Sequence, residues 1–164
     1  MNIANTLTRT RFHPALLAAC AMMLSFAVGA AQPAKKDAIV LDQAWARATP
    51  PGAPVAGGFV TIRNTAKRAD RLLSAVSPDA RLVEIHEMNM DNGVMRMRRI
   101  DDGLAIAPNA TLELKPGGYH LMFIGPKHPF VQGETITATL RFEQAGTREV
   151  RFEVRAMGSA APKR

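Results

Sequence analysis

From about residue 38 onward, the chain consists of short runs of apolar residues separated by turn-forming residues. Alternation is clearest in residues 135–142, where isoleucine, alanine, leucine and phenylalanine take every second position. A period of two is typical of a β-strand that buries one face. Clusters such as Pro50-Pro51-Gly52 and Pro116-Gly117-Gly118 mark turns. The pattern predicts strands at 39–46, 58–64, 72–77, 82–89, 94–100, 111–114, 119–124, 135–142 and 149–155.

These strands favour one all-β domain. Regularly spaced short strands with turn residues between them are typical of an antiparallel sandwich or barrel. No long segment shows the 3.6-residue period of an amphipathic helix. We therefore place a β-domain at residues 38–155, followed by a short tail at 156–164.

The first thirty residues have the pattern of a secretory signal peptide. Arg9 and Arg11 precede an apolar run over residues 15–30 that ends in small residues suited to cleavage near Ala30. The run is shorter than the roughly 20 residues that a membrane-spanning helix needs, so we expect no stable membrane insertion. Residues 31–37 form a linker. A lipid anchor at Cys20, which follows Leu-Ala-Ala, is the alternative to plain cleavage.

Composition narrows the classes of function. The 164 residues are 47% hydrophobic, too apolar for a disordered chain. Cys20 is the single cysteine, so the exported domain has neither a disulfide framework nor the thiolate of a blue-copper site. Export also argues against nucleic acid as the partner of the formal charge of +7. No Ser-His-Asp or paired-carboxylate motif indicates an enzyme.

Methionine is concentrated around a predicted hairpin. Asn92-Gly93 is the strongest short signal for a type I′ turn, and it pairs Met88 with Met97 and Met90 with Met95. Strand alternation then puts His86 on the same face as these four methionines. The opposite face is polar in its outer half, so we expect the hairpin to overhang the end of the domain.

A second pair of soft donors is His120-x-Met122. Residues at i and i+2 of a strand point the same way, and the turn at 116–118 precedes them. Thioethers suit Cu(I), and imidazole suits copper and zinc. The combination predicts a Cu(I) site, in which only the histidines must lose a proton before they bind.

Together these residues resemble the periplasmic copper chaperones of the PCuAC family. The family pattern is a histidine, ten residues, a methionine, about twenty-one residues, and then His-x-Met. Here His86, Met97, His120 and Met122 match it, with a long spacer of 22 residues. The resemblance extends over about residues 38–155 and includes the phrase Leu-Lys-Pro-Gly-Gly-Tyr-His-Leu-Met at 114–122.

The resemblance implies both a fold and a function. The expected fold is a cupredoxin-like Greek-key β-sandwich without the cupredoxin cysteine. The expected Cu(I) ligands are His86, Met97, His120 and Met122. Family members are thought to pass Cu(I) toward the CuA centre of cytochrome c oxidase subunit II, beside Sco-type proteins. A periplasmic carrier is therefore expected rather than an enzyme.

Two alternatives stay open at this point. Met88, Met90 and Met95 lie on the same predicted face but outside the four-residue pattern, as auxiliary donors or as a hydrophobic docking rim. The whole domain could also be a metal-free β-sandwich interaction module, with the methionine-rich face as its protein interface.

Overall fold

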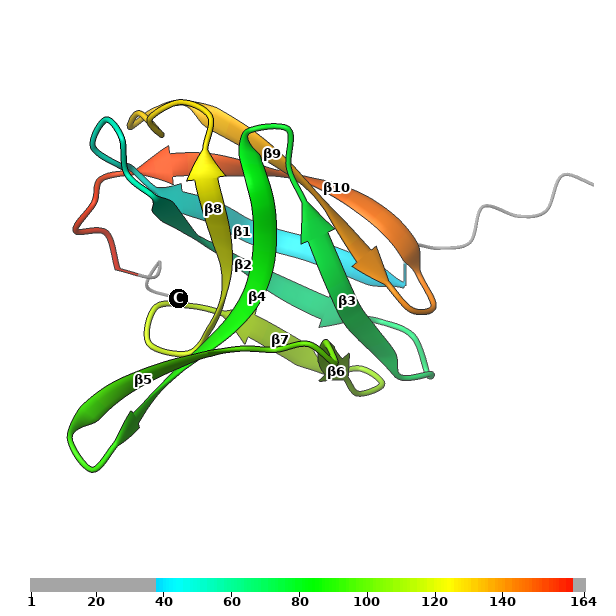
Figure 1. Cartoon of the computed structure of the whole chain (residues 1–164). Helices are drawn as coiled ribbons and strands as arrows, with labels where there is room; N and C mark the ends of the chain where they lie inside the picture. Colours follow the sequence, from blue (N-terminus) through cyan, green and yellow to red (C-terminus); the bar gives the residue numbers. More distant parts are fainter. Residues whose placement is uncertain (1–37, 161–164) are drawn as a thin grey trace, which may run out of the picture. The chain divides into compact units, whose positions relative to one another are not determined.

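Ten β-strands form the fold of residues 38–160, the part of the chain that the computed structural model describes (Figure 1). No helix in this part has the length and apolar character that a membrane crossing demands. The signal peptide, Cys20 and the linker 31–37 lie outside the described residues. The strands are β1 Ile39–Arg47, β2 Val55–Asn64, β3 Asp70–Val76, β4 Ala80–Asp91, β5 Val94–Arg99, β6 Leu104–Ile106, β7 Thr111–Leu114, β8 Tyr119–Pro126, β9 Thr135–Phe142 and β10 Gly146–Arg155.

All nine predicted strands are present, and one further strand was missed. The missed strand, β6, has only three residues, too few to show a period. β2 begins at Val55, three residues before the predicted start at Gly58, because Gly57 weakens the strand signal there.

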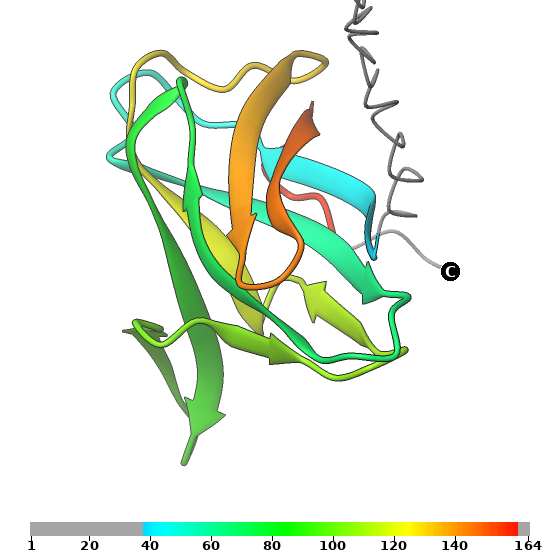
Figure 2. The same ribbon diagram turned by 90° about the vertical axis from the view of Figure 1, so that its right-hand side faces the viewer.

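The strands form one strongly curved sheet around a single core (Figures 1 and 2). Their order is β5-β4-β8-β2-β1-β10-β9-β3-β6, with β7 paired to β2. A further pairing of β3 with β4, at Ala75 and Val83, brings the sheet back onto itself. Among the described strands every pairing is antiparallel except β1 with β10, which run parallel at residues 45–47 and 153–155.

The core is filled by alternate residues of these strands. In β9 the even positions 136–142 are buried, as the alternation predicts. Phe123 of β8 lies at the centre, with its ring edge-on to Phe130 at 5.6 Å and to Phe152 at 5.8 Å between centroids. Edge-to-face rings are a favourable packing of aromatic side chains.

The β4–β5 hairpin extends beyond the sheet, and its predicted register is confirmed (Figures 1 and 2). Asn92 and Gly93 form the turn with φ of 48° and 79°, the left-handed values that a type I′ turn requires. Met88 lies opposite Met97, and Met90 lies opposite Met95. All six residues of β5 are exposed, so the hairpin does overhang the domain.

We expect Gly58→Ala to destabilise the domain by about 1–3 kcal/mol, because overpacking a filled core forces neighbours to move. A Cβ at Gly58 would lie 2.5 Å from Cε2 of Phe123, a side chain with no room to shift. Urea unfolding measures the change. Gly158→Ala is the matched control, since a Cβ there meets nothing within 4 Å. Equal stabilities for the two variants would contradict this packing.

Candidate metal centre

Two histidines lie side by side on the outer face of the sheet. β4 pairs with β8 so that His86 is opposite His120, and their ring centroids are 5.8 Å apart. The next residues on each strand, Ile85 and Leu121, are buried in the core. Because side chains alternate along a strand, burying this apolar pair turns both imidazoles outward.

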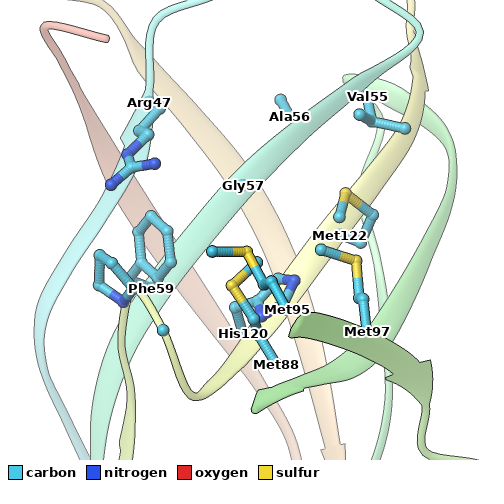
Figure 3. A pocket seen from close by; sticks show the side chains of 12 residues that line it. Arg47, Val55, Ala56, Gly57, Phe59, Met88, Met95, Met97, His120 and Met122 are labelled. Carbon is cyan, nitrogen blue, oxygen red and sulfur yellow. The ribbon is translucent and has the colours of Figure 1, made fainter. Parts of the chain in front are cut away.

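The thioethers reach the same face from three strands. Met122 of β8 is two residues from His120, and Met88 of β4 is two residues from His86. Met97 and Met95 come from β5, as their pairing in the hairpin requires. Figure 3 shows these four thioethers gathered on one side of a pocket, with Phe59 and Arg47 on the other.

The pocket has a volume of about 450 Å³ and holds five of the seven residues that the sequence singled out. These five are Met88, Met95, Met97, His120 and Met122. His86 lies outside the pocket lining and adjoins it through His120. Met90, 65% exposed toward the hairpin tip, also lies outside the lining. The structure thus separates Met88 and Met95 from Met90, which the sequence had grouped together.

His120 is held in one tautomer with its second nitrogen available. Its Nδ1 is 3.0 Å from the carbonyl oxygen of Gly118, and a carbonyl only accepts, so Nδ1 carries the hydrogen. Nε2 therefore presents a lone pair. The side chain is only 4% exposed, and this burial lowers the pKa of His120, with the charges of His86 and Arg47 acting in the same direction. A neutral, oriented imidazole is the form that binds a metal ion.

His86 is oriented by Glu84. Its Nε2 donates to Oε2 of Glu84 at 2.7 Å, and Oε1 of Glu84 accepts from Nη1 of Arg99 at 2.9 Å. The hydrogen bond from His86 and the charge of Arg99 lower the pKa of Glu84 despite its partial burial. Nδ1 of His86 is buried and has no hydrogen-bond partner. An unpaired buried nitrogen is costly, so it fits a site that a ligand completes.

A β-bulge builds the wall of the pocket opposite the methionines. Gln43 has a φ of 52°, and the register of β1 with β2 shifts between Asp42 and Trp45. Ile39 before the bulge and Ala46 after it both face the main core, so the bulge puts Trp45 and Arg47 on the opposite face of β1, where Trp45 is still buried. Trp45 packs on Phe59 at 4.5 Å between centroids, and Phe59 lies 6.4 Å from His120.

Glycine keeps the pocket open at its base. Gly57 of β2 pairs with Met122 and lines the pocket. A Cβ on Gly57 would lie 3.2 Å from the ring of Phe59, on the pocket wall that this ring forms. Sequence reasoning missed Gly57, Phe59, Arg47 and Glu84. Only the Gly57-Gly58 pair inside a strand carried a signal, since such glycines mark close approach.

The donor set is soft and contains few charges. Within residues 38–160, no three histidine, cysteine or carboxylate side chains gather as a metal site. Four thioethers and the imidazole of His120 line one pocket, and the imidazole of His86 adjoins that of His120. Such donors suit Cu(I) better than Mg²⁺, Ca²⁺ or Mn²⁺, which prefer oxygen ligands.

Comparison of the sequence with known proteins identifies relatives along the whole domain. The family model for putative LpqE-like lipoproteins matches residues 39–154. A protein named putative lipoprotein Lxx21020, from Leifsonia xyli subsp. xyli, is 32% identical over 145 residues, which cover 88% of this chain and 85% of the relative.

Solved structures with the same fold are also found. The copper-bound PCuAC domain from PmoF2 is 28% identical, with a TM-score of 0.62 over 73% of this chain and 93% of that domain. The Cu(I) form of DR1885 from Deinococcus radiodurans is 26% identical, with a TM-score of 0.56 over 75% of this chain and 80% of that protein. The expected cupredoxin-like all-β fold is therefore confirmed.

In the metal-free protein, we expect the pKa of His120 to lie below the usual value of 6.5 and the pKa of His128 to lie above it. Burial lowers the pKa of His120. The hydrogen bond to the Pro129 carbonyl and the nearby Asp79 raise the pKa of His128. A pH titration of the ring resonances by NMR measures both midpoints.

The two pKa shifts determine how each histidine makes the stability of the fold depend on pH. A lowered pKa means that the unfolded state binds the proton more readily, so His120 makes the fold less stable as the pH falls below 6.5. His128 has the opposite effect and makes the fold more stable as the pH falls, because its surroundings in the folded state favour the protonated ring. A midpoint for His120 at or above that of His128 would contradict the described burial.

Proposed function

Because the chain belongs to the PCuAC family, whose sequence model is that of putative LpqE-like lipoproteins, we propose that it is an exported metallochaperone that binds Cu(I). The observation that carries the proposal is the pocket in which four thioethers meet the oriented imidazole of His120. The proposed ligands are His86, Met97, His120 and Met122. The copper-bound structures of related domains support the choice of ion.

The donor atoms suit a carrier in an oxidising compartment. A thioether has no proton to lose and forms no disulfide, so it stays available where thiols are oxidised. The free Nε2 of His120 and the unpartnered Nδ1 of His86 supply the nitrogen ligands. A site that combines soft sulfur with neutral imidazole favours Cu(I) over harder cations.

The exposure of the ligands supports release by stepwise exchange. His120 is 4% exposed, whereas Met97 is 46% exposed on the overhanging hairpin. An incoming cysteine or methionine of an acceptor can replace the Met97 thioether while His120 still holds the ion. Transfer through a shared intermediate of this kind needs no catalytic residue, and we propose binding and delivery rather than catalysis.

The acceptor we propose is the CuA centre of cytochrome c oxidase subunit II, with Sco-type proteins acting beside this chain. Family resemblance supports this step. The lipoprotein names of the family and of the Leifsonia relative indicate an exported, envelope-associated protein. We propose the periplasm as its compartment, reached through the signal peptide, with an anchor at Cys20 as the alternative to release.

We expect the Met97→Leu, Met122→Leu double variant to lose Cu(I) binding while remaining folded. Leucine conserves volume and removes only the sulfur donor. The measurement is an anaerobic titration of Cu(I) in competition with a colorimetric chelator. The unmodified protein should retain one Cu(I) per chain, and the double variant should bind at least about a hundredfold more weakly, a loss of roughly 2.7 kcal/mol.

Met157→Leu is the matched control, since Met157 is an exposed methionine of the tail, outside the pocket lining. It should bind Cu(I) as the unmodified protein does. Failure of the unmodified protein to compete with the chelator would refute the proposal. The metal-free interaction module would then be the better interpretation of the methionine face.

A further inference from the structure

The free edge of β5 lies next to the pocket. β5 ends the strand order and pairs only with β4 among the described strands. Its residues are all exposed, and Met95 and Met97 are 61% and 46% exposed. An exposed strand edge presents unpaired backbone N–H and C=O groups, which another chain can pair with.

The register identifies which backbone groups face this edge. The N–H of Ile100 donates to the carbonyl of Ile85 at 2.8 Å, so the hairpin hydrogen bonds join odd residues of β4 to even residues of β5. Hydrogen bonds of an antiparallel strand alternate between its two sides. The N–H and C=O groups of Met95 and Met97 therefore point away from β4, toward the free edge.

The two methionines that line the pocket with their side chains thus also offer their backbones to a partner. Building on the proposed copper function, we propose that the copper acceptor docks by adding an extended segment antiparallel to β5. Residues directly opposite each other in such a pair share a face and have Cα atoms about 5.5 Å apart. A cysteine, methionine or histidine of the acceptor opposite Met97 would therefore lie beside the pocket, where ligand exchange takes place.

The arginines of β5 favour an acidic acceptor segment over a second copy of this chain as the strand that pairs with β5. Arg96 and Arg98 point to the face opposite the pocket and are 69% and 66% exposed, while each contacts one acidic residue of β4. Pairing β5 of two copies so that Met97 meets Met95 or another Met97 would put two arginines directly opposite each other. Like charges in that position are destabilising, whereas acidic residues of an acceptor segment would be favourable.

The test uses a capped eight-residue peptide of alternating glutamate and methionine, added to the copper-free exported protein. Amide hydrogen exchange by NMR is the readout. We expect the peptide to slow exchange at Met95 and Met97 at least about tenfold. The amides of Arg96 and Arg98, already bonded to β4, should change little.

Two N-methylated peptides make the geometry falsifiable. In the proposed antiparallel pair, the peptide's methionines face the pocket, and their N–H groups bond to β5. Methylating the methionine nitrogens should therefore weaken binding at least about tenfold, and methylating the glutamate nitrogens should leave it within about twofold. Unchanged exchange at Met95 and Met97, equal binding of both methylated peptides, or the reverse order would each overturn the proposal. So would protection that appears without peptide at high protein concentration, which would indicate a second copy.

Arg96→Glu separates the docking proposal from the copper proposal. The variant should weaken binding of the peptide several-fold and leave Cu(I) affinity in the chelator titration unchanged, because Arg96 lies on the face opposite the pocket. If the unmodified protein binds the peptide but does not bind Cu(I), the copper function alone is refuted. Cu(I) binding without any effect of the peptide on the edge amides would refute the docking alone.

Discussion

The pairing of β4 with β8 is the constraint on which the metal centre depends. One side of this pair buries Ile85 and Leu121, and the other carries His86 and His120. Burying each large aliphatic side chain contributes about 1.5–3 kcal/mol, so the core side sets the register. A slip of one residue would turn the imidazoles toward the core and the aliphatic side chains away from it. The position of the donors is therefore a consequence of core packing and needs no metal ion to maintain it.

The site combines a rigid inner part with an exposed outer part. His120 is buried, hydrogen-bonded to Gly118 and supported by the aromatic pair of Trp45 and Phe59. The outer donors Met95 and Met97 lie on β5, which pairs only with β4 among the described strands and is exposed along its length. A carrier needs both properties, because the ion must be held specifically and still be released. The free backbone edge of β5 places a docking strand on the same outer side, next to the donors that would exchange first.

The sequence predicted those parts of the site that local patterns determine. Asn92-Gly93 admits one turn type, and the turn fixes which methionines face each other across the hairpin. The i, i+2 spacing of His120 and Met122 likewise follows from strand geometry. The pocket itself was not predictable in this way. It depends on the bulge at Gln43, which turns Arg47 outward, and on Gly57, which leaves space beside the ring of Phe59. Both effects arise from strands distant in the sequence, and so does the separation of Met90 from Met88 and Met95.

The central claim is that thioethers and imidazoles of one outer face together bind Cu(I). X-ray absorption at the copper K-edge of the Cu(I)-loaded protein tests it most directly, since sulfur and nitrogen neighbours scatter differently. The account predicts an edge typical of Cu(I) and a ligand shell that contains both sulfur and imidazole nitrogen. The only sulfur atoms of residues 38–160 belong to methionines, so any sulfur neighbour within this domain is a thioether. A shell of nitrogen and oxygen without sulfur would contradict the account.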